Sequence, residues 1–214
     1  MKKTLYYLFD PLCGWCYGAG PALAHVRDVA EVAVELLPTG LFSGAGARPM
    51  DDEFAAYAWG NDRRIEALTG QRFTERYRGQ VLGDRQQLFD SGPATLALTA
   101  VALTRPQQEA AALAAIQQAR YVDGRDITSA ATLADVLRAQ GLDAAADKLA
   151  DPDPDAELKE AMRERTAQAR TLMQAFGVNG VPAFIVQIDG QRRLLRAASI
   201  YEDPLALGRL LEAA

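Results

Sequence analysis

The chain has two cysteines, Cys13 and Cys16, and they stand three positions apart. Two cysteines placed at random in 214 residues would show that spacing about once in a hundred chains. A Cys-x-x-Cys pair can form a redox-active dithiol, close a small structural disulfide or supply two ligands to a metal. Residues 13–16 are therefore the first candidate for chemistry.

The position of the pair favours redox chemistry. It follows an apolar run, Leu5–Phe9, that is typical of a buried strand, and it begins a helical pattern. Unpaired N–H groups and partial positive charge at a helix start stabilise a thiolate. We therefore predict Cys13 as the exposed nucleophile and Cys16, about one turn on, as the buried resolving thiol. Gly14 and Trp15 complete the turn, and Trp15 should offer substrates an apolar contact.

The alternatives fit less well. A disulfide across so small a loop would remove little entropy from the unfolded chain. A zinc site needs about four ligands, but the sole histidine, His25, lies about 13 Å from Cys16 along a helix. We expect no metal and interpret His25 as an ordinary helix residue. Asp10 is either a turn residue or a proton acceptor near the thiols, and the Asp10-Pro11 pair favours the turn.

Composition excludes several classes of protein. Lys and Arg number 23 against 28 Asp and Glu, which argues against nucleic-acid binding. No stretch reaches the roughly 18 apolar residues of a membrane-spanning helix. Met1-Lys2-Lys3-Thr4 leads into a run too short for a signal peptide, without a small-residue cleavage site. We therefore expect a cytoplasmic protein without nucleic-acid or membrane partners.

The predicted elements begin with a strand–helix–strand unit. A helix from Cys16 to about Ala30, kinked or irregular near Pro21, should link the strand Leu5–Phe9 to a second strand, Glu31–Leu37. Such crossovers are nearly always right-handed. The Gly-rich stretch 40–46 lacks the Gly-Lys-Ser/Thr of a phosphate loop.

Residues from about 51 to 176 are predicted to be helical without a convincing strand. The best candidates are Ala94–Thr104, Gln107–Tyr121, Ala130–Gln140 and Ala156–Phe176. The acidic turn Asp151–Pro154 precedes the last. A hairpin then follows, with strands Ala183–Ile188 and Gln191–Ala197 around Asp189-Gly190, and a helix containing Leu205–Leu211 ends the chain.

The chain resembles the DsbA family of the thioredoxin-like superfamily, most closely its cytoplasmic, FrnE-like branch of predicted protein-disulfide isomerases. The resemblance spans nearly the whole length. Its specific marks are Asp10–Tyr17 (DPLCGWCY) and Gly180–Phe184 (GVPAF), and its weaker marks are Ser91–Ala94 and Gly124–Ile127.

The resemblance implies an α/β thioredoxin fold (βαβ…ββα) with a large inserted α-helical domain. Residues 1–45 and 177–214 would form the thioredoxin part and residues 46–176 the insertion, which would cap the active site. Pro182 corresponds to the cis-proline of the family, which faces the redox pair and positions substrate backbone. We expect Val181-Pro182 to be cis, and a groove lined by apolar residues such as Trp15, Phe42 and Val181.

The resemblance also implies the activity: thiol–disulfide exchange on protein or peptide thiols and disulfides. The cysteine pair would need no cofactor, with the glutathione or thioredoxin system as a source of electrons. Gly14 and Trp15 replace the histidine-containing dipeptide of strongly oxidising members. Less stabilisation of the thiolate means a weaker oxidant, so we expect a reductase or isomerase.

Two other functions remain open at this stage. Kappa-class glutathione transferases and hydroxychromene-carboxylate isomerases share the helical insertion. They typically carry serine where this chain has Cys13, and need no second thiol at Cys16. A redox-controlled chaperone or binding module would use the helical block to hold unfolded clients. Turnover on insulin distinguishes an enzyme from such a module.

Overall fold

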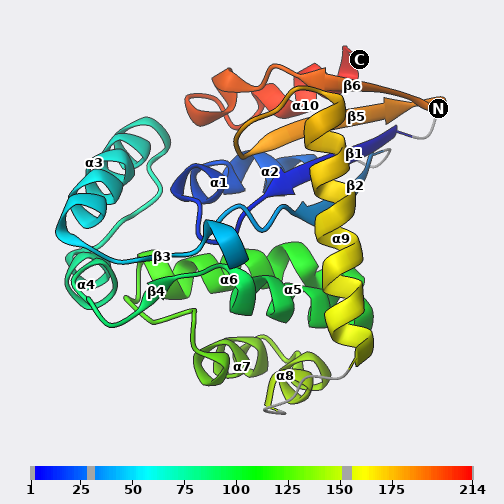
Figure 1. The fold of residues 1–214 in the computed structure, drawn as a ribbon. Helices are drawn as coiled ribbons and strands as arrows, with labels where there is room; N and C mark the ends of the chain where they lie inside the picture. Colours follow the sequence, from blue (N-terminus) through cyan, green and yellow to red (C-terminus); the bar gives the residue numbers. More distant parts are fainter. Residues whose placement is uncertain (1–2, 28–31, 151–155, 214) are drawn as a thin grey trace.

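The sheet at the centre of the fold has four strands in the order β2-β1-β5-β6 (Figure 1). The structure, a computed structural model, describes residues 3–27, 32–150 and 156–213. The strands are β1 (Lys3–Phe9), β2 (Val32–Pro38), β5 (Ala183–Ile188) and β6 (Gln191–Leu195). β1 pairs in parallel with β2 and antiparallel with β5, which pairs antiparallel with β6. The βαβ and ββ predictions are confirmed.

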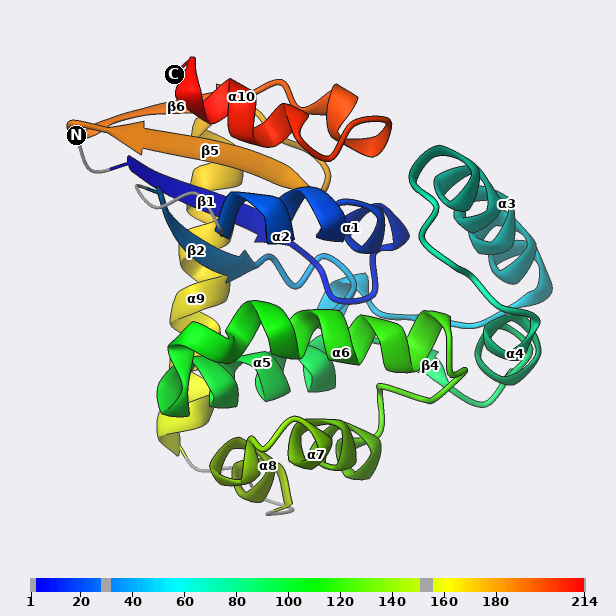
Figure 2. The same cartoon turned by 180° about the vertical axis from the view of Figure 1, so that it is seen from behind.

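Alternation along β1 divides the core between the two faces of the sheet. Leu5, Tyr7 and Phe9 join the larger apolar cluster, whereas Tyr6 and Leu8 join a smaller one. Successive side chains of a strand point to opposite faces, which explains this division. The smaller cluster includes residues of α9 (Ala156–Ala175), and Figure 2 shows α2 (Gly20–Arg27) and α10 (Ala206–Glu212) on the opposite face.

The helix after the cysteines is broken, as predicted, but two residues before Pro21. α1 (Gly14–Gly18) is followed by one turn residue, Ala19, and α2 begins at Gly20. Pro21 is thus the second residue of α2, where the backbone N–H that proline lacks would have no partner within the helix. The proline therefore begins the second helix instead of kinking a continuous one. Residues 28–31, where this helix was expected to end and β2 to begin, lie outside the described residues.

The four helices predicted between residues 51 and 176 are confirmed within two residues at each end. They are α5 (Gly92–Thr104), α6 (Glu109–Tyr121), α7 (Ala130–Ala139) and α9. Three further helices are α3 (Asp52–Thr69), α4 (Glu75–Tyr77) and α8 (Asp143–Ala150). The expected turn Asp151–Pro154 lies outside the described residues.

The prediction that this region contains no strand is wrong. Leu88–Phe89 (β4) pairs antiparallel with Arg48–Pro49 (β3). Two residues are too few to show an alternating pattern, so the pairing leaves no signal in the sequence. β3 directly precedes α3, and Phe89 of β4 lies beside the redox pair.

α9 connects the helical block to the sheet (Figure 1). Arg165, at mid-helix, donates to the hydroxyl oxygen of Thr99 at 3.1 Å and to the carbonyl of Leu36 at 2.9 Å, and it forms an ion pair with Glu109. One guanidinium thus joins α5, α6 and β2. The division of the chain at residues 46 and 177 remains a prediction.

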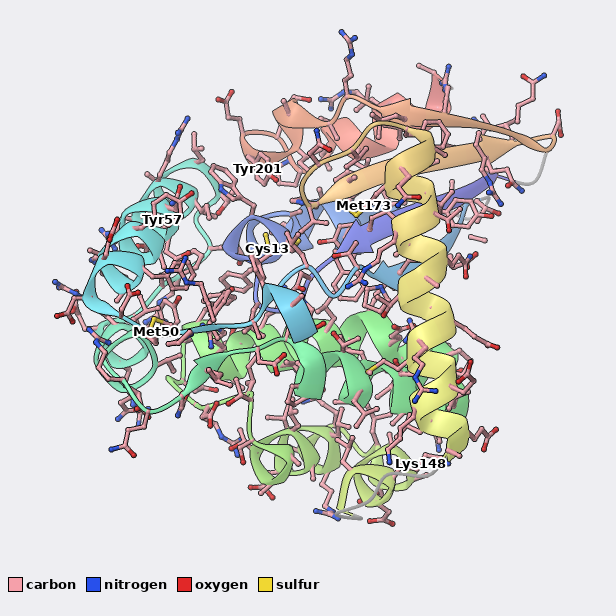
Figure 3. All side chains as sticks on the ribbon, in the orientation of Figure 1. Cys13, Met50, Tyr57, Lys148, Met173 and Tyr201 are labelled. Carbon is pink, nitrogen blue, oxygen red and sulfur yellow. The ribbon has the colours of Figure 1, made fainter. Side chains whose placement is uncertain are left out.

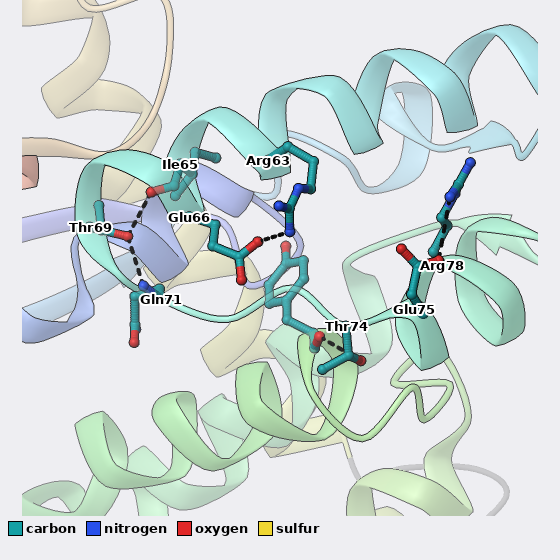
Figure 4. A network of polar contacts seen from close by, with 9 residues as sticks. Arg63, Ile65, Glu66, Thr69, Gln71, Thr74, Glu75 and Arg78 are labelled. Carbon is teal, nitrogen blue, oxygen red and sulfur yellow. Dashed lines mark hydrogen bonds and ion pairs between the residues drawn. The ribbon is translucent and has the colours of Figure 1, made fainter.

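The end of α3 is fixed against the redox helix by a small polar network (Figure 4). Thr69 donates to the carbonyl of Ile65 at 2.8 Å and accepts from the backbone N–H of Gln71 at 3.1 Å. The Gln71 side chain donates to the carbonyl of Tyr17 in α1 at 3.1 Å. These contacts position α3 as one wall of the site.

The last predicted hairpin is also confirmed. Asp189 and Gly190, at the turn, both have positive φ, 48° and 84°. Two such residues make the type of turn whose twist matches that of the flanking strands. A 3₁₀ turn at Ala198–Tyr201, which was not predicted, precedes α10.

Candidate active site

Cys13 is the N-cap residue of α1, and Cys16 lies within the helix. The backbone N–H of Cys13 donates to the carbonyl of Asp10 at 3.1 Å, which closes the turn between β1 and α1. The two thiols are free, so the structure describes the dithiol form. The sequence places the pair correctly at the junction of strand and helix.

The expectation that Cys13 is exposed is wrong in degree. Its exposed fraction is 7%, against 1% for Cys16. The order of exposure is as predicted, but the helical block covers Cys13 and leaves it facing a cavity instead of open solvent. The Cys13 side chain is therefore reached through that cavity.

The Val181-Pro182 peptide bond is cis, which confirms the prediction. The loop that contains it faces the redox pair, because the Cys13 thiol donates to the carbonyl of Val181 at 3.5 Å. This hydrogen bond thus joins Cys13 to Val181, which is 168 positions away in the chain.

Burial controls the chemistry of Cys16. Loss of hydration raises the pKa of this thiol well above its ordinary value, and the neighbouring Cys13 raises it further. The hydroxyl of Tyr7, which is fully buried on β1, donates to the carbonyl of Cys16 at 3.1 Å. Cys16 is therefore held as a neutral thiol until its proton is removed.

Asp10 is a buried turn residue. Its carboxylate accepts hydrogen bonds from the backbone N–H groups of Leu12 (3.0 Å) and Phe42 (3.1 Å) and from the hydroxyl of Ser91 (2.7 Å). The turn role favoured by the sequence is confirmed. The same contacts explain Ser91, part of a weaker mark of the resemblance. Burial nevertheless raises the pKa of Asp10, and these hydrogen bonds oppose that rise.

A cavity of about 210 Å³ opens at Cys13 between α1, α3 and the segment that carries Phe42. Trp15 and Phe42 line it, as predicted, while Val181 contacts the thiol but is not part of the lining. Figure 3 shows Cys13 beside α3, which carries Tyr57, and below the segment that carries Tyr201. The rest of the lining is largely aromatic, with Phe54, Tyr57, Tyr77, Phe89 and Tyr121.

Asp62 is a residue of this cavity that the sequence reasoning missed. It is 4% exposed, and its carboxylate accepts from the hydroxyl of Tyr77 at 2.9 Å. Burial raises its pKa to about 7, although Tyr77 and the nearby Arg120 act in the opposite direction. A signal existed: Asp62 stands at helical spacing between Ala58 and Ile65, on the face of α3 that lines the cavity.

Asp62 also explains the glycine between the cysteines. A Cβ atom at Gly14 would lie 2.5 Å from Oδ1 of Asp62 and 3.1 Å from Cδ1 of Ile65. Both are side-chain atoms of α3, which packs against α1. The absence of a side chain at position 14 therefore lets the helical block approach the redox pair closely.

Trp15 is fixed on the rim of the cavity. Its ring packs edge-on against Tyr201 with centroids 4.9 Å apart, and the guanidinium of Arg64 lies 5.9 Å from its centroid. A cation over an indole face is a favourable contact. The apolar surface predicted for Trp15 thus stands beside a positive charge supplied by α3.

Among the described residues, no group of three or more His, Cys, Asp or Glu side chains could hold a metal ion. Within residues 3–27, 32–150 and 156–213, no helix combines the length and apolar character needed to cross a membrane.

Comparison with known proteins gives a consistent result. The family described as DSBA-like thioredoxin domain matches residues 4–201. The cytosolic disulfide reductase DsbM from Pseudomonas aeruginosa is 36% identical, with a TM-score of 0.87 over 98% of this chain and 97% of that chain. The same reductase, solved with GSH, gives 34% identity and a TM-score of 0.86 over 98% of each chain.

A more distant solved structure shares the arrangement. A candidate protein disulfide isomerase from Nitrosomonas europaea is 26% identical, with a TM-score of 0.80 over 100% of this chain and 97% of that chain. A search of curated proteins finds no match.

Proposed function

The chain belongs to the DSBA-like thioredoxin domain family, and we propose that it acts as a reductase of protein or peptide disulfides through Cys13 and Cys16. One observation carries the proposal. The Cys13 thiol faces the Val181 carbonyl at 3.5 Å beside a cavity of about 210 Å³, while Cys16 lies within the helix that Cys13 caps.

The chemistry proceeds in two exchanges. The Cys13 thiolate attacks a substrate disulfide, forms a mixed disulfide and releases one substrate thiolate, which takes up a proton. Cys16 then loses its proton and attacks the Cys13 sulfur. This step forms the Cys13–Cys16 disulfide and releases the second substrate thiolate. The substrate gains two electrons, and the enzyme must regain them from another thiol.

Two observations favour reduction over oxidation. Neither Gly14 nor Trp15 carries positive charge, so the residues between the cysteines do not stabilise the reduced form electrostatically. The Pseudomonas aeruginosa relative is described as a cytosolic disulfide reductase and was solved with GSH. We therefore propose a cytoplasmic site of action and glutathione as the donor of electrons.

Isomerisation is a second candidate, because the Nitrosomonas europaea relative is described as a candidate isomerase. It would need Cys13 to attack and leave without the help of Cys16. The buried Cys16 thiol, poised to resolve every mixed disulfide, favours reduction. A kappa-class transferase would not need the Cys16 thiol, and a binding module would need neither the Cys13 nor the Cys16 thiol.

An insulin-reduction assay with glutathione, glutathione reductase and NADPH tests the proposal. The parent protein should turn over, Cys13→Ser should not, and Cys16→Ser should accumulate mixed disulfides with insulin. Absence of turnover by the parent, or trapping by Cys13→Ser in place of Cys16→Ser, would overturn the assignment. Protection of insulin from aggregation without turnover would identify a binding module instead.

A further inference from the structure

The resolving step requires Cys16 to lose its proton inside the protein. Cys16 is 1% exposed, and burial raises the pKa of its thiol. A thiol with these properties needs a nearby acceptor, since only the thiolate attacks a disulfide. Cys16 is not among the residues that line the cavity at Cys13, so that cavity does not bring its thiol into contact with solvent.

The titratable groups around Cys16 do not carry its proton out of the protein. Burial raises the pKa of Asp10, but this carboxylate is 0% exposed and already accepts three hydrogen bonds, and its negative charge opposes a thiolate at Cys16. Tyr7 donates to the Cys16 carbonyl, and burial raises the pKa of Tyr7 and of Tyr201, so both phenols stay protonated. Cys13 is occupied in the mixed disulfide at this stage.

A second cavity reaches Cys16 from the opposite side. Its volume is about 110 Å³, and it lies between α2 and α6, which face each other in Figure 2. Tyr7 and Cys16 line it together with small residues of both helices, and two of these, Ala24 and Ala114, are exposed at the surface. Since each water takes about 30 Å³ in the liquid, the cavity has room for a few molecules.

Gln117 shows that this cavity needs a polar occupant. Its side chain lines the cavity and is 2% exposed. Its Nε2 has no hydrogen-bond partner among the residues that the structure describes. Buried amide groups in native proteins are nearly always paired, and ordered water is the usual partner when no protein group is in reach.

We infer that the cavity between α2 and α6 holds the water that receives the Cys16 proton, with Gln117 as its positioning residue. The inference rests on the proposed function. Cys16 S–H gives its proton to this water, and the sulfur forms the bond to Cys13 as the bond from Cys13 to the substrate sulfur breaks. The water passes the proton to solvent between the helices, and the released thiolate takes one from solvent.

A two-phase experiment with DTNB separates this step from the first attack. The reduced protein releases one coloured thiolate when Cys13 attacks and a second when Cys16 resolves the mixed disulfide. Gln117→Leu removes the amide, and Ala114→Leu blocks the surface end of the cavity. The control Gln118→Leu makes the same change at an exposed position of the same helix.

Both cavity variants should slow the second phase about tenfold or more and leave the first phase unchanged. The pH dependence of the second-phase rate should move to higher pH. Gln118→Leu should change neither. An unaltered second phase in Ala114→Leu, or equal slowing of both phases, would overturn the inference. If Gln117→Leu fails to fold, the result for Ala114→Leu decides the test. Absence of the first phase in the parent would instead contradict the proposed function.

Discussion

The substitution Asp62→Asn should stabilise the protein above neutral pH. The pKa of Asp62 rises from its ordinary 3.8 to about 7 because the carboxyl group is buried. Between these values the unfolded chain ionises while the folded protein keeps the proton, so stability falls as pH rises and levels off above about 7. At 1.36 kcal/mol per pKa unit, this ionisation costs about 4 kcal/mol at pH 8.

Asparagine stays neutral and can still accept the hydrogen bond from Tyr77. Its advantage over the parent in the free energy of unfolding should therefore grow by about 2–3 kcal/mol between pH 5 and pH 8. Urea unfolding at the two pH values measures this difference. The control Asp51→Asn changes a carboxylate whose pKa is lowered by the hydrogen bond from Phe54, so its effect should not grow in that direction. A pH-independent effect of Asp62→Asn would show that the pKa of Asp62 is not raised in the folded protein.

Three other predictions concern the surroundings of the redox pair. Gly14→Ala should lower the free energy of unfolding by about 1–3 kcal/mol, because its Cβ would meet a carboxylate of α3; Gly60→Ala, with open space around it, should show no such loss. Ser91→Ala removes a buried hydrogen bond to the turn and should cost about 1–3 kcal/mol in denaturant unfolding. Alkylation of the reduced protein should modify Cys13 well before Cys16, and mass spectrometry showing equal rates would contradict their roles.

Local patterns were enough to predict the redox pair and most of the fold. The cysteines, the turn before them and the hairpin at Asp189-Gly190 all depend on neighbours in the sequence. The same holds for α5, α6, α7 and α9, which are helices of 10 to 20 residues and therefore long enough to recognise. Elements without such a pattern, such as β4 and the short α4, were missed.

The surroundings of the pair could not be predicted in the same way, because they depend on contacts between distant segments. Ser91 reaches Asp10 across 81 positions, and Val181 reaches Cys13 across 168. The burial of Cys13 follows from the way α3 packs on α1, which no local pattern specifies. Asp62, a buried polar residue of α3 that lines the cavity, is visible in the sequence only as an exception to an apolar stripe.

The reduction potential of the Cys13–Cys16 pair decides whether the protein reduces or oxidises disulfides. Equilibration of the protein with defined ratios of reduced and oxidised glutathione, followed by quantification of free thiols, gives this value. We expect a potential near that of thioredoxin, about −270 mV, because a reductase must be stable in its oxidised form. A potential near that of DsbA, about −120 mV, would identify a strong oxidant and contradict the proposed direction of electron flow.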